Sequence, residues 1–416
     1  MEHPQPVTMP GHGVETVLDD LPESIVVDEI LVRLPARDIM LCRCVRKGWR
    51  SATSTDKFML DHHRRQPLLP VLGHVVESQT ATRLLPSIDA GAGQQQLCPV
   101  IRIRTYSGRL LAALDGLIIV SHGSVSVRTS SSHPVNFFIC NPVTRECAPL
   151  VTPPSQHGFK HHIAGLYRHQ PSGEYRVLWV STPRYFDRAD TAYTTFYYVV
   201  AVGSSDIRCI AEGSIAQTTP TETALCKGLP DSSGCPPVHH RGSLHWGLPG
   251  RSIMVFNTAA ETFRLMGRPV QLYFHQLFEM DGTLALCSVS PEQMTVDVWV
   301  VQDYGAETTE TWSFKHQINL SGVDDPIPRS WVMRFPRMVV LNNGELLIQF
   351  IRGCGPVLHC DIDGKFLEYV KSKDGQVIGL WITKHYLQES LIPLPRLHEM
   401  GEEDGATQGP PLFVGL

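Results

Sequence analysis

Apolar residues recur with helical spacing near the start of the chain. They stand at i, i+3, i+4 and i+7, the spacing of one helix face, at Val27, Ile30, Leu31 and Leu34. Pro22 suits the first turn of this helix, because a missing N–H removes no hydrogen bond there. Pro35 cannot continue the helix, so the pattern predicts a short helix that ends before it.

Two further short helices are predicted before residue 64. Asp38 is a suitable N-cap, and apolar side chains follow it at Met40, Leu41, Cys44 and Val45. Trp49 and Ala52 mark the third helix. Three short helices form a module near the lower size limit for independent folding, and each large apolar side chain left in water forgoes ~1.5–3 kcal/mol. We therefore expect a partner protein to cover part of residues 19–64.

The pattern changes to short apolar runs broken by Gly, Pro, Asn and Asp over residues 65–395, which is typical of strands and turns. Four segments place a turn Gly before an apolar strand: 115–118, 241–244, 281–284 and 343–346. Repeated hairpins of this kind are typical of β-propeller blades, and at the usual blade length this region allows about six to seven. A β-sandwich is the structural alternative.

The two ends of the chain have a different composition. Residues 1–18 are polar and rich in Pro, His and Gly, which predicts a disordered leader. Residues 396–416 read as a flexible tail. The predicted fold class is therefore α+β multidomain: a small three-helix module, then a mostly antiparallel, all-β, β-propeller-like domain.

Composition and charge narrow the classes of function. The 416 residues carry a formal net charge of -5 with scattered Lys and Arg, so we expect no nucleic-acid partner and no anionic membrane partner. No secretory signal and no apolar run of membrane-spanning length is found. The 11 Cys are scattered without a C-x-x-C, which predicts free, mostly buried thiols in a reducing compartment, the cytoplasm and/or the nucleus.

No motif of enzyme chemistry stands out. The chain has no G-x-S-x-G nucleophile elbow, no phosphate-binding loop and no G-x-G-x-x-G. His157, His161 and His162 have a spacing that could chelate on a helix, but Pro153, Pro154 and Gly158 favour a loop there. We expect no catalytic residue, no metal and no cofactor.

The N-terminal segments resemble the F-box, in the form common in plants. The matching stretches are Leu21 to Ile25, Glu29 to Leu31, Leu34 with Pro35, and Arg43 to Arg50. The resemblance implies docking on a Skp-type adaptor protein, and through it on cullin and RING subunits. Carried over by position, the residues at this interface or supporting it are Leu21, Pro22, Ile30, Leu31, Leu34, Pro35, Val45, Lys47 and Trp49. Gly48 and Ala52 depart from the common pattern, which puts the affinity in doubt.

The strand-rich region resembles the F-box-associated domains of plant F-box proteins, particularly those of grasses. The matching stretches are 138–149, 172–178, 239–246, 261–264 and 296–300. The resemblance implies a substrate-recognition subunit of an SCF-type cullin–RING ubiquitin ligase, not itself an enzyme, that binds an unknown protein target. The alternative is a β-propeller that binds a small ligand or acts as an enzyme, with an unrelated helical N-terminus. A polar constellation in the central channel would distinguish the two.

Overall fold

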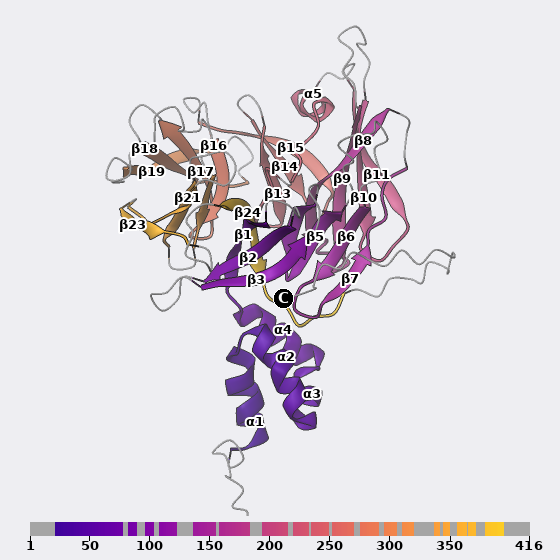
Figure 1. Ribbon diagram of the computed structural model, residues 1–416. Coiled ribbons are helices and arrows are strands. Elements are labelled where there is room, and N and C mark those ends of the chain that lie inside the picture. The colour runs from indigo at the N-terminus through magenta and orange to yellow at the C-terminus, as the bar shows by residue number, and fades with distance from the viewer. Residues whose placement is uncertain are drawn as a thin grey trace, which may run out of the picture. The chain divides into compact units, whose positions relative to one another are not determined.

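The computed structural model describes residues 21–394 with internal gaps. The gaps are 78–81, 90–95, 104–107, 123–135, 155–157, 184–193, 215–218, 233, 249–251, 270–274, 291–294, 306–309, 320–336, 342–343, 350–355, 364 and 372–378. The chain divides into a helical unit, Met1–Gln66 with Ser390–Ile392, and a β unit, Pro67–Glu389 with Pro393–Leu416 (Figure 1). The predicted leader, 1–18, and the predicted tail, 396–416, lie outside the described residues.

The first helical stretch is not one regular α-helix. It consists of α1 (Glu23–Ile25), a π-helical turn η2 (Val26–Ile30) and a 3₁₀ turn η3 (Leu31–Arg33). Pro22 precedes it, and Leu34 is already extended, as the residue before a proline prefers. The sequence predicted both ends of this helix but not its change of pitch.

The helical unit contains one helix more than the three predicted. After α2 (Ala36–Val45) and α3 (Lys47–Thr53), a further helix α4 covers Asp56–Arg65. Its N-cap is Thr55, whose hydroxyl accepts a hydrogen bond from the Phe58 N–H at 3.3 Å. Phe58 and Met59 are buried, so the apolar face of α4 completes the core of this unit.

A bond network joins α4 to the end of the first helical stretch. The Leu34 carbonyl accepts from the His62 ring at 2.8 Å and from the Gln66 side chain at 3.2 Å. This carbonyl cannot find a helical partner, because the chain turns extended at Leu34. The buried apolar residues of the unit are Val26, Val27, Leu31, Val32, Ala36, Ile39, Phe58 and Met59.

The β unit consists of four-stranded antiparallel sheets, six of them within the described residues. Blade 1 contains β24 (Leu380–Gln388), β1 (Leu68–Glu77), β2 (Thr82–Asp89) and β3 (Gln96–Ile103). Blade 2 contains β4 (Arg109–Leu114), β5 (Leu117–His122), β6 (Asn136–Asn141) and β7 (Glu146–Pro149), and blade 3 contains β8 (Phe159–Arg168), β9 (Tyr175–Pro183), β10 (Thr194–Ala201) and β11 (Ile207–Ser214).

Blade 4 contains β12 (Val238–His240), β13 (Ser243–Gly247), β14 (Ser252–Asn257) and β15 (Thr262–Gly267). Blade 5 contains β16 (His275–Met280), β17 (Thr283–Ser290), β18 (Thr295–Val301) and β19 (Trp312–Asn319), and blade 6 contains β20 (Arg337–Val340), β21 (Leu346–Gln349), β22 (Leu358–Cys360) and β23 (Phe366–Tyr369). A short helix α5 (Pro220–Cys226) lies between blades 3 and 4 in the chain.

The blades form a closed ring rather than a sandwich of two sheets. The strand at one edge of each sheet is called its inner strand: β24, β4, β8, β12, β16 and β20. Inner strands of neighbouring sheets contact one another in the pairs β24–β4, β4–β8, β12–β16, β16–β20 and β20–β24. Blades 3 and 4 meet where the Trp246 indole donates to the Ala164 carbonyl at 3.2 Å. Strand β24, near the end of the chain, pairs with β1 near its beginning, from Leu68 opposite Gln388 onward. This pairing closes the ring.

Side chains also connect the inner strands of adjacent blades. The Gln276 amide donates to the Met338 carbonyl at 2.6 Å and accepts from the Met338 N–H at 3.1 Å. The Tyr386 hydroxyl accepts from the Val340 N–H at 2.9 Å and donates to its carbonyl at 3.2 Å. These bonds satisfy backbone groups on inner strands that face another blade.

The predicted turns are confirmed where the structure describes them in full. Asp115 and Gly116 both have positive φ, 48° and 84°, as do Arg241 with Gly242 and Asp281 with Gly282. Positive φ at both central residues is the requirement of the tight hairpin turn that follows the twist of the strands. In the fourth pair, Asn343 is outside the described residues, and Gly344 has a φ of 84°.

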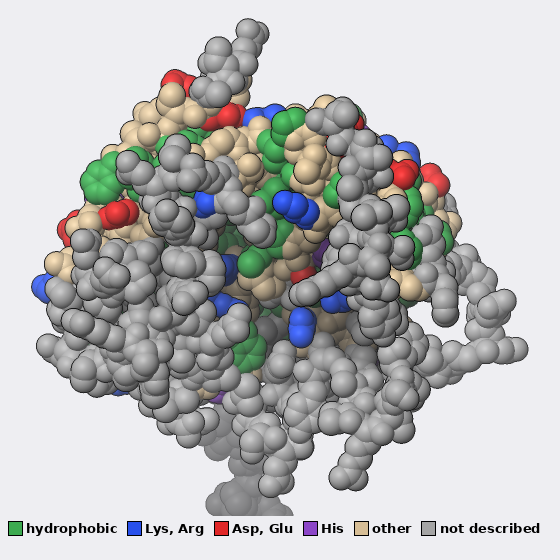
Figure 2. All heavy atoms as spheres, turned by 90° about the horizontal axis from the view of Figure 1, so that it is seen from above, with side chains coloured by type: hydrophobic (Ala, Val, Ile, Leu, Met, Phe, Trp, Pro, Cys, Tyr) green, Lys and Arg blue, Asp and Glu red, His purple; other side chains and the backbone are tan. Residues whose placement is uncertain are grey.

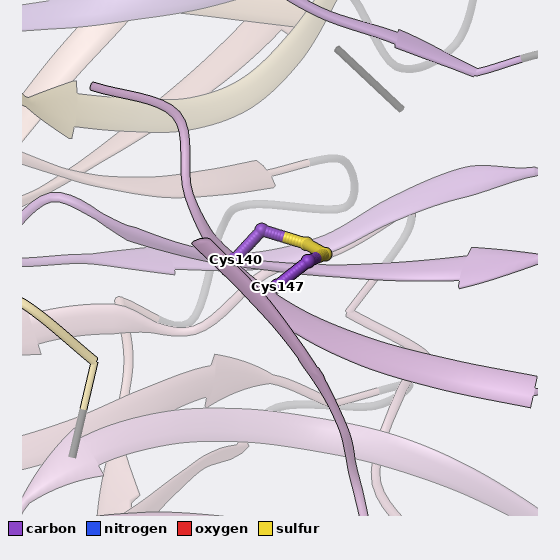
Figure 3. The surroundings of a disulfide bond; sticks show 2 residues. All are labelled: Cys140 and Cys147. Carbon is purple, nitrogen blue, oxygen red and sulfur yellow. A yellow bond between two sulfur atoms is a disulfide. The ribbon is translucent and has the colours of Figure 1, made fainter. Parts of the chain in front are cut away.

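The structure corrects the prediction that all thiols are free. Cys140 on β6 stands directly opposite Cys147 on β7 in the strand register, and their sulfurs form a disulfide (Figure 3). The sequence spacing did not predict this disulfide, because the two residues are brought together only by the turn between β6 and β7. Of the free cysteines that the structure describes, Cys44, Cys209 and Cys235 are exposed and Cys226, Cys287 and Cys360 are buried. Among the described residues, no helix combines the length and apolar character needed to cross a membrane.

Candidate adaptor-docking surface and propeller channel

The helical unit leaves large apolar side chains in water. On α2, Leu41 is 61% exposed and Val45 is 76% exposed. They are four residues apart, so they lie on one face of the helix. Leu21 and Ile25 are also exposed. An exposed apolar group of this kind on so small a unit is typical of a protein–protein contact.

The structure sorts the predicted adaptor residues by exposure. Leu31 is only 3% exposed and belongs to the core of the helical unit. Half-buried positions are Ile30, Leu34 and Trp49, and the exposed ones are Leu21, Pro22, Pro35, Val45 and Lys47. Leu41 and Ile25 are exposed too, but they were not among the interface residues predicted from the sequence. The i, i+4 spacing of Leu41 and Val45 was the signal that could have found Leu41.

The connection between α2 and α3 is held by side-chain bonds. Arg43 donates from Nε to the Thr53 hydroxyl at 3.0 Å and from Nη2 to the Thr53 carbonyl at 2.6 Å. This carbonyl is one of the last in α3, where a cation is favourable. The Arg46 guanidinium lies 5.5 Å from the centre of the Trp49 ring, within cation–π distance. These contacts fix the direction in which Val45, Lys47 and Trp49 are presented.

A cavity of about 670 Å³ lies inside the propeller. Its walls come from the inner strands of every blade described: β4, β8, β12, β16, β20 and β24 contribute Leu114, Leu166, Val238, Phe278, Val340 and Tyr386, respectively. Trp246, Met338 and Leu341 add further apolar surface. One face of the propeller is visibly hollowed near its centre (Figure 2). Size and apolar lining are typical of a small-molecule site.

Polar groups also line this channel. Burial lowers the pKa of His385 to about 4, although a hydrogen bond with the Ser232 backbone opposes the change. Burial likewise lowers the pKa of His239 to about 4, against the attraction of Asp115. Burial also lowers the pKa of Lys384. A cluster of perturbed groups in a concave site is typical of a functional site.

Two of the histidines considered as metal ligands do not lie in the predicted loop. His161 and His162 lie on strand β8, not in a loop, and His157 is outside the described residues. The His162 ring bonds the Leu229 carbonyl at 2.9 Å. Within the described part of the chain, no three His, Cys, Asp or Glu side chains come together as metal ligands.

A helical unit followed by a ring of four-stranded antiparallel blades defines a β-propeller protein with an N-terminal helical unit. Residues 94–374 match the F-box associated beta propeller domain family, and the chain belongs to that family. An F-box protein of Arabidopsis thaliana is 22% identical over 299 residues, 71% of this chain and 70% of its own. A second relative from the same plant is 24% identical over 304 residues, 72% of this chain and 71% of its own.

Solved structures with a related shape are more distant. TolB from Acinetobacter baumannii has a TM-score of 0.40 and 12% sequence identity, covering 80% of this chain and 72% of that one. A likeness at this level says nothing about what this chain binds.

Proposed function

We propose that the chain is the substrate-recognition subunit of an SCF-type cullin–RING ubiquitin ligase. The helical unit docks on a Skp-type adaptor, which connects it to cullin and RING subunits, and the propeller holds a protein target. The observation that carries the proposal is the exposed apolar face of α2, with Leu41 and Val45 in water. Membership of the F-box associated propeller family and the F-box relative support it.

The chain contributes proximity rather than chemistry. Holding a target beside a charged ubiquitin carrier converts a bimolecular encounter into a local one, which alone raises the rate of transfer. The side chains required for transfer belong to the other subunits.

The docking face can be tested directly by placing charge on it. Leu41→Asp with Val45→Asp is expected to weaken binding of a purified plant Skp-type adaptor at least a hundredfold, because the contact would bury two unpaired carboxylates. The measurement is isothermal titration calorimetry with the full-length chain. Both side chains are already in water, so the unbound protein is expected to fold normally, with unchanged circular dichroism.

The matched control is Leu60→Asp on α4. Leu60 is also an exposed leucine, 40% in water, but it lies outside the stretches that resemble the F-box. Adaptor affinity is expected to stay within about threefold of the wild-type value, as for a residue away from a contact. Equal binding by the Leu41/Val45 double variant and the wild-type protein would refute docking through α2.

A further inference from the structure

Strand β24 contains an unusual bulge at the channel wall. Val71 of β1 is paired with His385 and the next residue, Leu72, is paired with Ile382, so Thr383 and Lys384 are extra. Lys384 has a φ of +66°, and it is the one non-glycine residue of the described chain with positive φ inside a strand. A lysine gains nothing from this backbone conformation, which is costly for side chains with a Cβ.

The bulge is built by specific bonds. The Thr383 hydroxyl donates to the Val71 carbonyl and accepts from the His385 N–H, the latter at 3.2 Å. The consequence is that both Lys384 and His385 line the central cavity. In a regular strand, neighbouring side chains point to opposite faces of the sheet, so Lys384 and His385 could not both line the cavity.

The His385 side chain lacks a partner on one side. It is 4% exposed, and its Nε2 atom is buried with no hydrogen bond among the described residues. A buried imidazole nitrogen without a partner is costly unless something else meets it. The cavity against which His385 lies is the place from which such a group can come.

The charged groups that line the channel differ in their partners. Three carboxylates line the cavity: Asp115 accepts from the Tyr175 hydroxyl at 3.1 Å, Asp281 is 2.5 Å from the Lys315 ammonium, and Glu279 is 3.7 Å from the His240 ring. Lys384 has no ion pair with any described residue. The charged or polar side chains that influence its ammonium group are Cys235, Arg337 and Cys287, none of them a carboxylate.

We propose that the central channel of the propeller binds a small organic anion, a carboxylate on an apolar body, with its charge at Lys384 and a polar group meeting His385. The apolar body fits against Trp246, Phe278 and Met338, which line the same cavity. The volume of about 670 Å³ is suited to a molecule of this kind. This site goes beyond the proposed role in a ubiquitin ligase and does not depend on adaptor docking.

The test uses a panel of small aromatic and aliphatic monocarboxylates, including 2-naphthoate, with the corresponding primary amides. Binding to the full-length chain is measured by saturation-transfer NMR and calorimetry. Several carboxylates are expected to bind the wild-type protein, with each amide at least tenfold weaker. Lys384→Met is expected to weaken carboxylate binding at least tenfold, whereas Lys160→Met, which removes an exposed lysine on β8, is expected to change nothing.

Thermal unfolding shows whether the Lys384→Met variant is folded. Met is as long and unbranched as Lys at the bulge, and it leaves no unpaired charge in the channel, so Lys384→Met is expected to unfold at the wild-type temperature or above. Absence of binding by every carboxylate of the panel overturns the proposal. Amides that bind as tightly as carboxylates, or undiminished carboxylate binding by a folded Lys384→Met variant, overturn it equally.

Discussion

A single carboxylate connects two blades. Glu261 lies in the turn between β14 and β15, with a φ of 55°, and its side chain is 7% exposed. It accepts hydrogen bonds from the Tyr167 hydroxyl at 2.7 Å, from Arg176 at 2.7 Å, and from Arg208. Burial alone would raise the pKa of Glu261, but the bonds from Arg208, Tyr167 and Arg176 lower it overall.

Glu261→Gln is expected to lower the free energy of unfolding at pH 7 by about 2–3 kcal/mol, because a hydrogen-bonded charge is lost beside two arginines. A carboxyl with a lowered pKa in the folded state stabilises the protein above its unfolded pKa of about 4.3. That contribution is lost as the pH falls through the folded pKa. Wild-type stability should therefore decline with acidification in this range, and the variant should decline less. Urea unfolding between pH 3 and 7 measures both.

Glu174→Gln is the control for this prediction. Glu174 also pairs with Arg176, at 2.8 Å, but half of its side chain is in water. A solvated pair contributes little, so a loss of no more than about 1 kcal/mol is expected. If both variants lose the same amount, the Glu261 network does not have the role assigned to it.

Closure by β24 is the main feature at the level of elements. This strand supplies the inner strand of blade 1, contributes Lys384 and His385 to the channel, and contacts the inner strands of blades 2 and 6. Ring closure between distant parts of the chain removes the free edges that an open sheet would expose.

Deleting residues 380–416 is expected to abolish cooperative unfolding and to produce aggregated protein, because β1 and the inner strands of blades 2 and 6 lose their neighbour. Deleting only residues 396–416, the tail predicted from the sequence, is the control and should leave the melting temperature unchanged. Size-exclusion chromatography and calorimetry report both results. A compact, cooperatively folded 1–379 fragment would show that the closure by β24 is dispensable.

Sequence patterns could predict features that depend on neighbouring residues. The Asp-Gly and Arg-Gly turns identified hairpins because positive φ is a local demand of the turn. Pro22 and Pro35 marked the ends of the first helix for a similar reason. By contrast, α4 was missed because the run from His62 to Arg65 is polar in sequence, although His62 and His63 are buried together with Phe58 and Met59.

Long-range features were beyond such patterns. The partners of Glu261 are 94, 85 and 53 residues away, and Thr383 bonds a carbonyl 312 residues away. Leu31 and Leu41 look alike as apolar helix positions, yet one is core and the other surface, which only tertiary packing decides. The polar groups of the channel could not be predicted for the same reason, since they come from blades that are far apart in the sequence.

At the scale of the whole molecule, the two units offer different kinds of surface. The helical unit offers an exposed apolar face suited to a protein partner, and the propeller offers a closed ring with a central cavity. The proposed function uses the first for assembly with a ligase and the second unit for target recognition. A ligand bound in the channel would then change the affinity of the propeller for its protein target. Binding of the ligand and docking of the adaptor can be measured separately.

The most direct test of the central claim compares protein complexes recovered from plant cells treated with a proteasome inhibitor. Full-length wild-type protein and the Leu41→Asp/Val45→Asp variant are purified by the same tag and quantified by mass spectrometry. Under the proposed function, the wild-type protein recovers the Skp-type adaptor, cullin and RING subunits, and the variant loses all three while keeping proteins bound to the propeller. Equal recovery of cullin by both proteins, or by neither, would contradict it.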